Sequence, residues 1–227
     1  MIEIVFENLH FVICDKPSGV LSTPSRFEED DPRRCLGTAL QQQLKIQIYP
    51  VHRLDFEVSG LVMYAKNAEA HRKANAWFET KHVQKTYRAL TTGQDFSHIP
   101  TNVPNEREKI ELISRSSFEW RSRILRGKRR AFESPQGKPS LTLANYLSID
   151  ERGYQQWDLH PVTGRSHQLR FDLSRHGFPI VGDKLYGSKS EWINENAIAL
   201  RSFEIDFSNA PGAAALGLPE KIVVPAL

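Results

Sequence analysis

Two segments that lie far apart in the 227-residue chain carry residue types whose spacing could support catalysis. Val51–Lys66 reads V-H-R-L-D-F-E-V-S-G-L-V-M-Y-A-K and places Asp55 close to Arg53, just before an apolar run. Thr163–Arg170 reads T-G-R-S-H-Q-L-R and supplies Arg165. A guanidinium pairs with a carboxylate through two hydrogen bonds and can hold it ionised in a site shielded from water. A reactive carboxylate, a fixed cation and abundant arginine indicate chemistry on a nucleic acid rather than on a small acidic metabolite.

Positive charge is concentrated in one short segment, although the formal net charge of the chain is only +3. The basic residues of this segment are Arg121, Arg123, Arg126, Lys128, Arg129 and Arg130. Such a run is either a solvated loop or an arm that contacts phosphates, and the second would make binding strongly dependent on salt. In the second case Arg129 and Arg130 are the candidates for contact with the substrate.

Length and composition are those of a globular protein with a large core. The first residues show no basic stretch followed by an apolar one, and no apolar run approaches the length of a bilayer span. Cys14 and Cys35 form no C-x-x-C pair, so we expect reduced thiols. These features predict a monomeric cytoplasmic protein without membrane association, built as a single catalytic domain over residues 1–227.

The elements that must position the two segments are strands and helices in irregular order. Three helices are predicted, over Leu36–Leu44, Ala68–His82 and His167–His176. Asn67 is expected to cap the second helix, Thr163 or Ser166 the third, and Gly177 to end it. Strands are predicted over Ile2–Phe6, Phe11–Cys14, Leu61–Ala65, Thr86–Thr91, Leu141–Ile149, Tyr154–Pro161 and Ile198–Phe207. Glu108–Lys138 gives no clear pattern. The absence of a regular strand–helix–strand rhythm predicts an α+β fold with a mixed, largely antiparallel sheet flanked by helices and loops.

The motifs in these segments resemble those of the RluA-type RNA pseudouridine synthases. H-R-L-D-x-x-x-S-G-L at His52–Leu61 is similar to the catalytic signature of that family. The other similar segments are D-K-P-S-G at Asp15–Gly19, K-T-Y-R-A at Lys85–Ala89, G-R-S-H-Q-L-R at Gly164–Arg170 and P-I-V-G-D at Pro179–Asp183. The resemblance covers roughly Glu3 to Phe207 and implies isomerisation of uridine to pseudouridine in a structured RNA, an rRNA or tRNA stem-loop. It also implies that no metal or organic cofactor is needed. Many members carry a separate N-terminal RNA-binding domain, which we do not expect in this chain.

The resemblance also implies roles for single side chains. Asp55 would be the catalytic carboxylate, which either attacks C1′ of the ribose or removes a proton from the sugar. Arg165 would hold Asp55 ionised. Tyr87 would stack on the uracil and is a candidate base for the late proton transfer from C5. The alternative is that Tyr87 is only an aromatic residue of the core. Leu169 would close the floor of the pocket and exclude water.

A base inside a stack cannot react, so the target nucleotide must flip out. Arg53 is the candidate to fill the space left behind, because a guanidinium can stack on bases and pair with phosphates. His52 would share this role or orient the loop. Arg170 and Lys184 are expected either to contact phosphates or to lie on a solvated surface.

Two other functions fit parts of the pattern. An RNA N-glycosidase would need a second carboxylate, and Glu57 lies near enough in sequence to Asp55 to be one. A non-catalytic RNA-binding module would need neither, but a buried pair of aspartate and arginine is costly to keep for binding alone. Release of free uracil would support the glycosidase, and retention of the base in the RNA would support the synthase.

Overall fold

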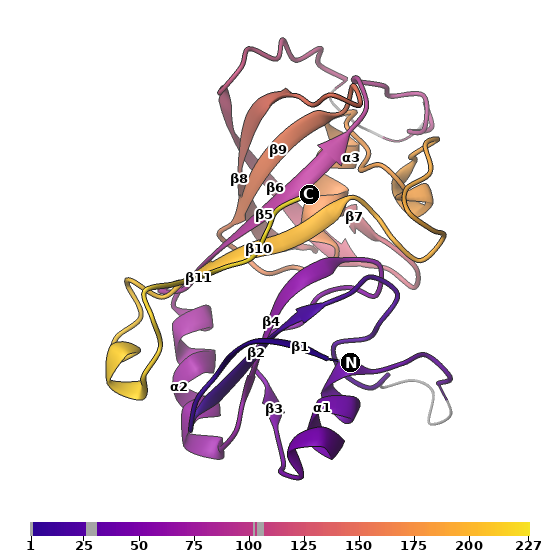
Figure 1. Ribbon diagram of the computed structural model, residues 1–227. Helices are drawn as coiled ribbons and strands as arrows, with labels where there is room; N and C mark the ends of the chain where they lie inside the picture. The colour runs from indigo at the N-terminus through magenta and orange to yellow at the C-terminus, as the bar shows by residue number, and fades with distance from the viewer. Residues whose placement is uncertain (1, 26–30, 102, 104–106) are drawn as a thin grey trace. The chain divides into compact units, whose positions relative to one another are not determined.

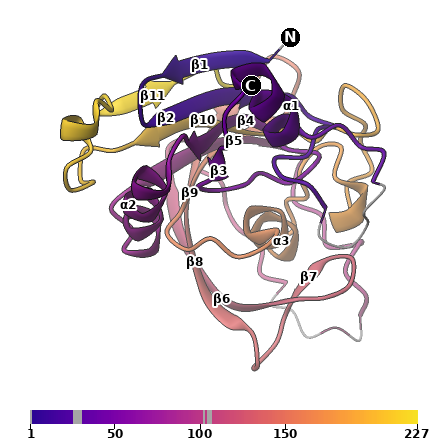
Figure 2. The ribbon, with the colours of Figure 1, turned by 90° about the horizontal axis from the view of Figure 1, so that it is seen from below.

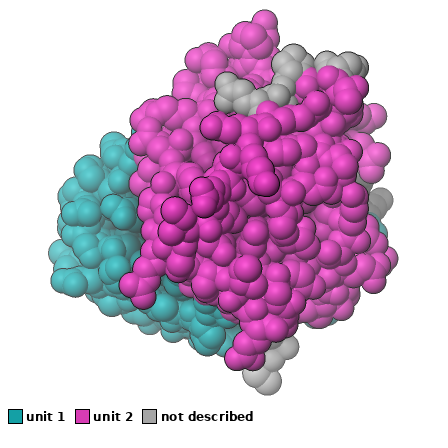
Figure 3. Space-filling model, turned by 90° about the horizontal axis from the view of Figure 1, so that it is seen from above, with its two compact units in different colours: residues 1–85, 201–226 teal, residues 86–200, 227 magenta. Residues whose placement is uncertain are grey.

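The computed structural model describes residues 2–25, 31–101, 103 and 107–227. The chain forms two compact units, which Figure 3 shows in different colours. Unit 1 contains residues 1–85 and 201–226, and unit 2 contains residues 86–200 and 227. The two candidate segments therefore fall in different units, with Asp55 in the first and Arg165 in the second. A single catalytic domain over the whole chain stays a prediction.

Unit 1 is a mixed sheet with a helix packed against each face (Figure 1). Its elements are β1 (Glu3–Glu7), β2 (Phe11–Lys16), α1 (Leu36–Leu44), β3 (Tyr49–Pro50), β4 (Ser59–Ala65), α2 (Ala68–Glu79), β10 (Leu200–Asp206), a 3-10 turn (Ala214–Leu216) and β11 (Lys221–Val223). The strands are ordered β1-β2-β4-β10-β11, and β3 also pairs with β4. Only the β4–β10 pair among these is parallel.

The alternation of side chains in β2 explains why this unit has two cores. Phe11 and Ile13 point to one face, where they pack with Trp77 of α2. Val12 and Cys14 point to the other face, toward α1. Successive side chains of a strand point to opposite faces, so a segment covered on both sides is apolar at every position, as Phe11–Cys14 of β2 is.

The helices of unit 1 follow their local sequence. α1 has the predicted bounds. α2 begins where Asn67 accepts a hydrogen bond from the Ala70 N–H at 2.9 Å, which confirms the predicted cap. It ends at Glu79 rather than His82.

Unit 2 is an antiparallel sheet with one helix packed on it. Its elements are β5 (Gln84–Thr91), β6 (Ser117–Arg126), β7 (Ala131–Glu133), β8 (Lys138–Ile149), β9 (Gln155–Pro161), α3 (Gln168–Arg175) and a 3-10 turn (Lys184–Tyr186). The strand order is β5-β9-β8-β6-β7, and α3 contacts β7, β8 and β9 (Figure 2). Together the two units confirm the α+β fold with a mixed, largely antiparallel sheet.

An aromatic cluster fills the core of unit 2. Trp157 is fully buried, and its ring centroid lies 5.7 Å from that of Trp120, 5.3 Å from that of Tyr146 and 5.1 Å from that of Phe178. These rings come from β9, β6, β8 and the segment after α3, so they join the sheet to its helix.

No helix in the described part of the chain has the length and hydropathy to cross a bilayer.

The predicted cap of α3 is wrong. Neither Thr163 nor Ser166 caps the helix, and the N-cap position is His167, whose backbone is left-handed at φ 54°. The Thr163 hydroxyl instead donates to Gln168 Oε1 at 2.8 Å. The predicted end is correct, since Gly177 follows the helix with φ 83°.

Asp172 of α3 is a buried carboxyl group on the face that packs against β8. The Thr142 hydroxyl donates to one of its oxygens at 2.7 Å, and the other oxygen has no hydrogen-bond partner among the described residues. Burial raises the pKa of Asp172 to about 7, against the opposing effects of the Thr142 hydrogen bond and the Arg175 charge. The folded state therefore holds this proton at pH values where the unfolded chain has lost it.

We predict that Asp172→Asn stabilises the protein at pH 8 and not at pH 4. The folded pKa of Asp172 lies above the unfolded value of about 3.9, so the stability that its proton confers is complete below pH 4. It is lost as the pH rises through 7, where a charge must be buried. The variant should gain ~1–3 kcal/mol in free energy of unfolding at pH 8. Urea titrations between pH 4 and 8 measure this, with Glu151→Gln at an exposed position as control. A gain that does not change with pH would contradict it.

Candidate active site

Asp55 is half-buried in the loop that joins β3 to β4, and the residues on both sides of it are fixed. The Leu54 N–H donates to Ser22 Oγ at 3.0 Å, and the Ser22 hydroxyl donates back to the Leu54 carbonyl at 3.0 Å. The Phe56 carbonyl accepts from the Gly19 N–H at 2.9 Å. Because both neighbours of Asp55 are tied to the segment after β2, its backbone has little freedom to move.

The side chain of Lys16, at the end of β2, adds a third tie to this loop. It is completely buried. Its ammonium donates to the main-chain carbonyls of Pro17 at 2.9 Å, Val20 at 2.8 Å and Phe56 at 3.3 Å. Burial lowers the pKa of Lys16 to about 8, and the nearby negative charges oppose this shift; they belong to Asp55, Glu57 and Asp15. The Asp55 carboxylate therefore lies within electrostatic reach of a buried cation.

Lys16 is a site residue that the sequence reasoning missed. The D-K-P-S-G segment was identified only as part of a motif, and a lysine beside a proline predicts an exposed turn. The signal that could have found it is its position in the strand that begins with the apolar run Phe11–Cys14, two residues beyond the end of that run, where its side chain points to the same face as that of Cys14.

His52 is engaged by the fold rather than presented to a substrate. Its Nε2 accepts from the Met63 N–H at 3.2 Å, and its ring stacks on Phe78 with centroids 5.1 Å apart. Burial, with the nearby Lys85 charge, lowers the pKa of His52 to about 3, so the ring is neutral. Orientation of the loop is therefore the one of its two expected roles that the geometry supports, and contact with RNA stays a prediction. Arg53, by contrast, is exposed.

Tyr87 and Leu169 of unit 2 are almost buried. Tyr87 lies in β5 opposite Leu159 of β9, and 7% of its surface is exposed. Leu169 lies in the first turn of α3 and is also 7% exposed. Each residue therefore presents a small edge, as a residue that lines a narrow pocket does, and their roles toward the base stay predictions.

Arg165 is half-buried in the turn before α3, which side chains hold in place. Its Nε donates to the Pro139 carbonyl at 2.9 Å, and its own N–H donates to Gln168 Oε1 at 3.0 Å. Gln168 Nε2 donates in turn to the Leu141 carbonyl at 3.0 Å. The turn is thereby fixed to β8. The pairing of Arg165 with Asp55 stays a prediction, since the two residues belong to different units.

Arg170 does not have the expected role at a phosphate. Its Nε and one terminal nitrogen donate to the two carboxylate oxygens of Asp183 at 2.7 and 2.8 Å, and both side chains are 1% exposed. A bidentate pair at this depth cannot turn outward without leaving a charge buried alone. Arg170 is therefore a structural residue. Lys184 is exposed, and its ammonium lies 3.2 Å from the Glu191 carboxylate.

The basic segment forms a hairpin, and whether it is only a solvated surface or an arm that contacts phosphates stays open. β6 pairs with β7, and the Gly127 N–H closes the turn on the Arg130 carbonyl at 3.0 Å. We call the hairpin from Arg121 to Glu133 the basic arm. Arg129 and Arg130 are exposed at its tip. The sequence did not predict these strands because a polar residue, Ser122, interrupts the inward-facing series Phe118, Trp120 and Ile124.

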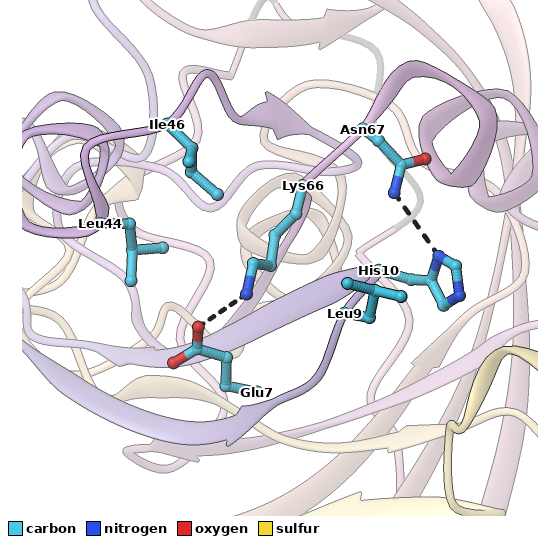
Figure 4. A pocket seen from close by; sticks show the side chains of 7 residues that line it. All are labelled: Glu7, Leu9, His10, Leu44, Ile46, Lys66 and Asn67. Carbon is cyan, nitrogen blue, oxygen red and sulfur yellow. Dashed lines mark hydrogen bonds and ion pairs between the residues drawn. The ribbon is translucent and has the colours of Figure 1, made fainter.

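Two surface hollows involve none of these residues. One of about 560 Å³ lies in unit 1 near the turn after β1 (Figure 4), where Lys66 pairs with Glu7 at 2.7 Å and Asn67 bonds to His10 at 3.5 Å. The other, of about 520 Å³, lies in unit 2 around Trp120.

Within the described residues, no three histidine, cysteine or acidic side chains gather as metal ligands would.

Comparison with known proteins gives one consistent result. The family model described as RNA pseudouridylate synthase matches residues 10–175. The dual-specificity RNA pseudouridine synthase RluA of Vibrio parahaemolyticus is 34% identical over 209 residues, which cover 90% of this chain and 77% of that protein. An uncharacterized RNA pseudouridine synthase of Helicobacter pylori is 32% identical, with coverage of 97% of this chain and 75% of that protein.

The fold agrees with a solved structure. The human RNA pseudouridylate synthase domain containing 1 superposes with a TM-score of 0.70 at 24% identity, over 99% of this chain and 83% of that one. The family match spans the H-R-L-D loop with Asp55, the strand with Tyr87 and the turn with Arg165. The chain therefore belongs to the RNA pseudouridylate synthase family as an RluA-type member, an enzyme that isomerises uridine to pseudouridine in RNA.

Proposed function

We propose that this enzyme acts on a uridine in an rRNA or tRNA stem-loop, with Asp55 as its catalytic carboxylate. The observation that carries this is the fixed loop around Asp55, where Ser22, Gly19 and Lys16 hold both neighbouring residues. Such a loop presents one carboxylate in one orientation, as attack at a single sugar requires. The N1–C1′ bond breaks, the uracil turns over, and C5 bonds to C1′, so substrate and product are isomers.

The other catalytic roles are proposed with it. Asp55 either attacks C1′ or removes a proton from the sugar, and both routes need an ionised carboxylate. Arg165 supplies the positive charge that favours this form. Tyr87 stacks on the uracil and accepts the C5 proton late in the reaction. Leu169 excludes water from the activated sugar.

The exposed basic residues are proposed to bind the RNA. Arg53 fills the space of the flipped nucleotide, because it is exposed and precedes Asp55 by two residues. Arg129 and Arg130 contact phosphates from the tip of the basic arm. We further propose that the protein acts as a monomer in the cytoplasm. Its two cysteines are free thiols, which a reducing compartment maintains.

We predict that Asp55→Asn abolishes pseudouridine formation by at least a thousandfold and changes RNA affinity less than threefold, because the amide keeps the shape and loses the charge. Glu57→Gln is the matched control in the same loop, and it should retain most of the activity. Tritium release from C5-labelled uridine in RNA measures turnover. Retained turnover in Asp55→Asn would remove that residue from the mechanism. Free uracil released by the wild type, and lost in Glu57→Gln, would favour the glycosidase instead.

We predict that Lys16→Met lowers the free energy of unfolding by ~1–3 kcal/mol, because three main-chain carbonyls lose the donor that they share. Turnover should fall about tenfold or more under conditions where the variant is fully folded, since the Asp55 loop loses a tie. Lys66→Met removes a lysine near the surface that pairs with Glu7, so it should cost less than about 1 kcal/mol and leave turnover unchanged. Equal effects of the two substitutions would contradict a special role for Lys16.

We predict that Arg129→Glu with Arg130→Glu weakens RNA binding and lowers the slope of log Kd against log salt by ~1–2, as expected when phosphate contacts are lost. Arg72→Glu with Lys81→Glu makes the same change in net charge on exposed residues of unit 1 and serves as the control. Filter binding between 50 and 300 mM KCl gives both slopes. If the arm variant keeps the wild-type slope, the arm does not contact the backbone of the RNA.

A further inference from the structure

The hydroxyl of Tyr186 joins two parts of unit 2 that are distant in sequence. Tyr186 is 3% exposed. Its Oη accepts a hydrogen bond from the Ala131 N–H at 2.7 Å and lies 3.1 Å from Nδ1 of His167. A backbone amide can only donate, so the hydroxyl oxygen is the acceptor toward Ala131, and the same hydroxyl lies within hydrogen-bond distance of the imidazole. Ala131 is the first residue of β7 in the basic arm, and His167 lies two residues after Arg165.

His167 has a backbone conformation that needs such support. Its φ of 54° and ψ of 22° lie in the left-handed region, which a residue with a Cβ rarely adopts. A strained conformation persists only where the surroundings fix it. The His167 ring meets the Tyr186 ring edge-on, with centroids 5.8 Å apart. Tyr186 therefore contacts this residue through both its hydroxyl and its ring, at the point where the Arg165 turn enters α3.

Tyr186 is itself held independently of these two partners. The guanidinium of Arg170, paired with Asp183, lies 5.3 Å from the centre of its ring. The Ser174 hydroxyl donates to its carbonyl at 2.8 Å. Contacts with α3 and with the buried ion pair therefore fix the position of its ring. A hydroxyl on a ring held in this way can transmit the position of one partner to the other.

We propose that Tyr186 is a positioning residue that couples the basic arm to the turn carrying Arg165. Its hydroxyl fixes the tip end of the arm through Ala131, the residue that follows the turn, and the orientation of the Arg165 turn through His167. The proposal rests on the functions proposed above for the arm and for Arg165. It assigns to a residue outside the H-R-L-D and G-R-S-H-Q-L-R segments a joint effect on RNA binding and on turnover.

The variant Tyr186→Phe tests this, because it keeps the ring and its contact with Arg170 and removes only the hydroxyl. Tyr146→Phe is the matched control, a buried tyrosine of β8 that packs on Trp157 in the same unit. We expect Tyr186→Phe to raise the Kd for RNA about threefold or more and to lower kcat at saturating RNA about tenfold. The control should change neither. A defect that disappears at saturating RNA would overturn the effect on Arg165.

Amide hydrogen exchange without RNA separates this inference from the proposed function. In Tyr186→Phe the Ala131 amide and the amides of residues 165–168 should both exchange at least tenfold faster than in the wild type, while those of β5 keep their rates. Unchanged exchange at either place would overturn the coupling. If the proposed function failed because Asp55→Asn stayed active, the exchange rates would still report on the hydroxyl. A general rise in exchange across unit 2 would show a loss of stability and would also overturn the inference.

Discussion

The loop that carries Asp55 depends on the burial of one ammonium group. The buried Lys16 ammonium donates to the carbonyl of Val20, in the segment after β2, and to that of Phe56, in the Asp55 loop. Burial favours the neutral form of a lysine, and it lowers the pKa of Lys16 to about 8. The negative charge of Asp55 opposes that shift. The same ammonium that donates to the Phe56 carbonyl is therefore favoured in its charged form by the acidic residues around it, which links the geometry of the loop to the protonation of Lys16.

Unit 2 uses a different cation for a similar purpose. Arg170 and Asp183 form a bidentate pair that is closed to solvent. A buried pair of this kind adds little net stability, but it fixes relative orientation, because breaking it leaves a charge buried alone. Here it orients α3 against the segment that carries Tyr186, and α3 begins at the turn of Arg165. In both units a buried cation therefore fixes the backbone next to a side chain that is proposed to act in the reaction.

The sequence predicted the elements whose patterns are local, and it failed where tertiary contacts decide. The strands with apolar runs and the helices α1 and α2 could be predicted, since burial requires their periodicity. The cap of α3 could not, because Gln168 satisfies the turn through bonds to Leu141 and Thr142 of β8, far away in the chain. The same holds for Arg170 and Lys16. A basic residue in a motif predicts contact with RNA, and only the fold shows whether that residue is instead bound to a partner inside the protein.

Sorting the basic residues by exposure also changes what the net charge means. The formal charge of +3 counts Lys16 and Arg170, whose fields are largely cancelled inside the protein. The tip of the basic arm, with Lys128, Arg129 and Arg130, is exposed. At physiological salt its field decays over about 8 Å, so it acts only on a phosphate that passes close to the tip. The arm can thus fix the path of an RNA backbone without reading a base. Under the proposed function, selection of one uridine would then come from the shape of the RNA around the Asp55 loop.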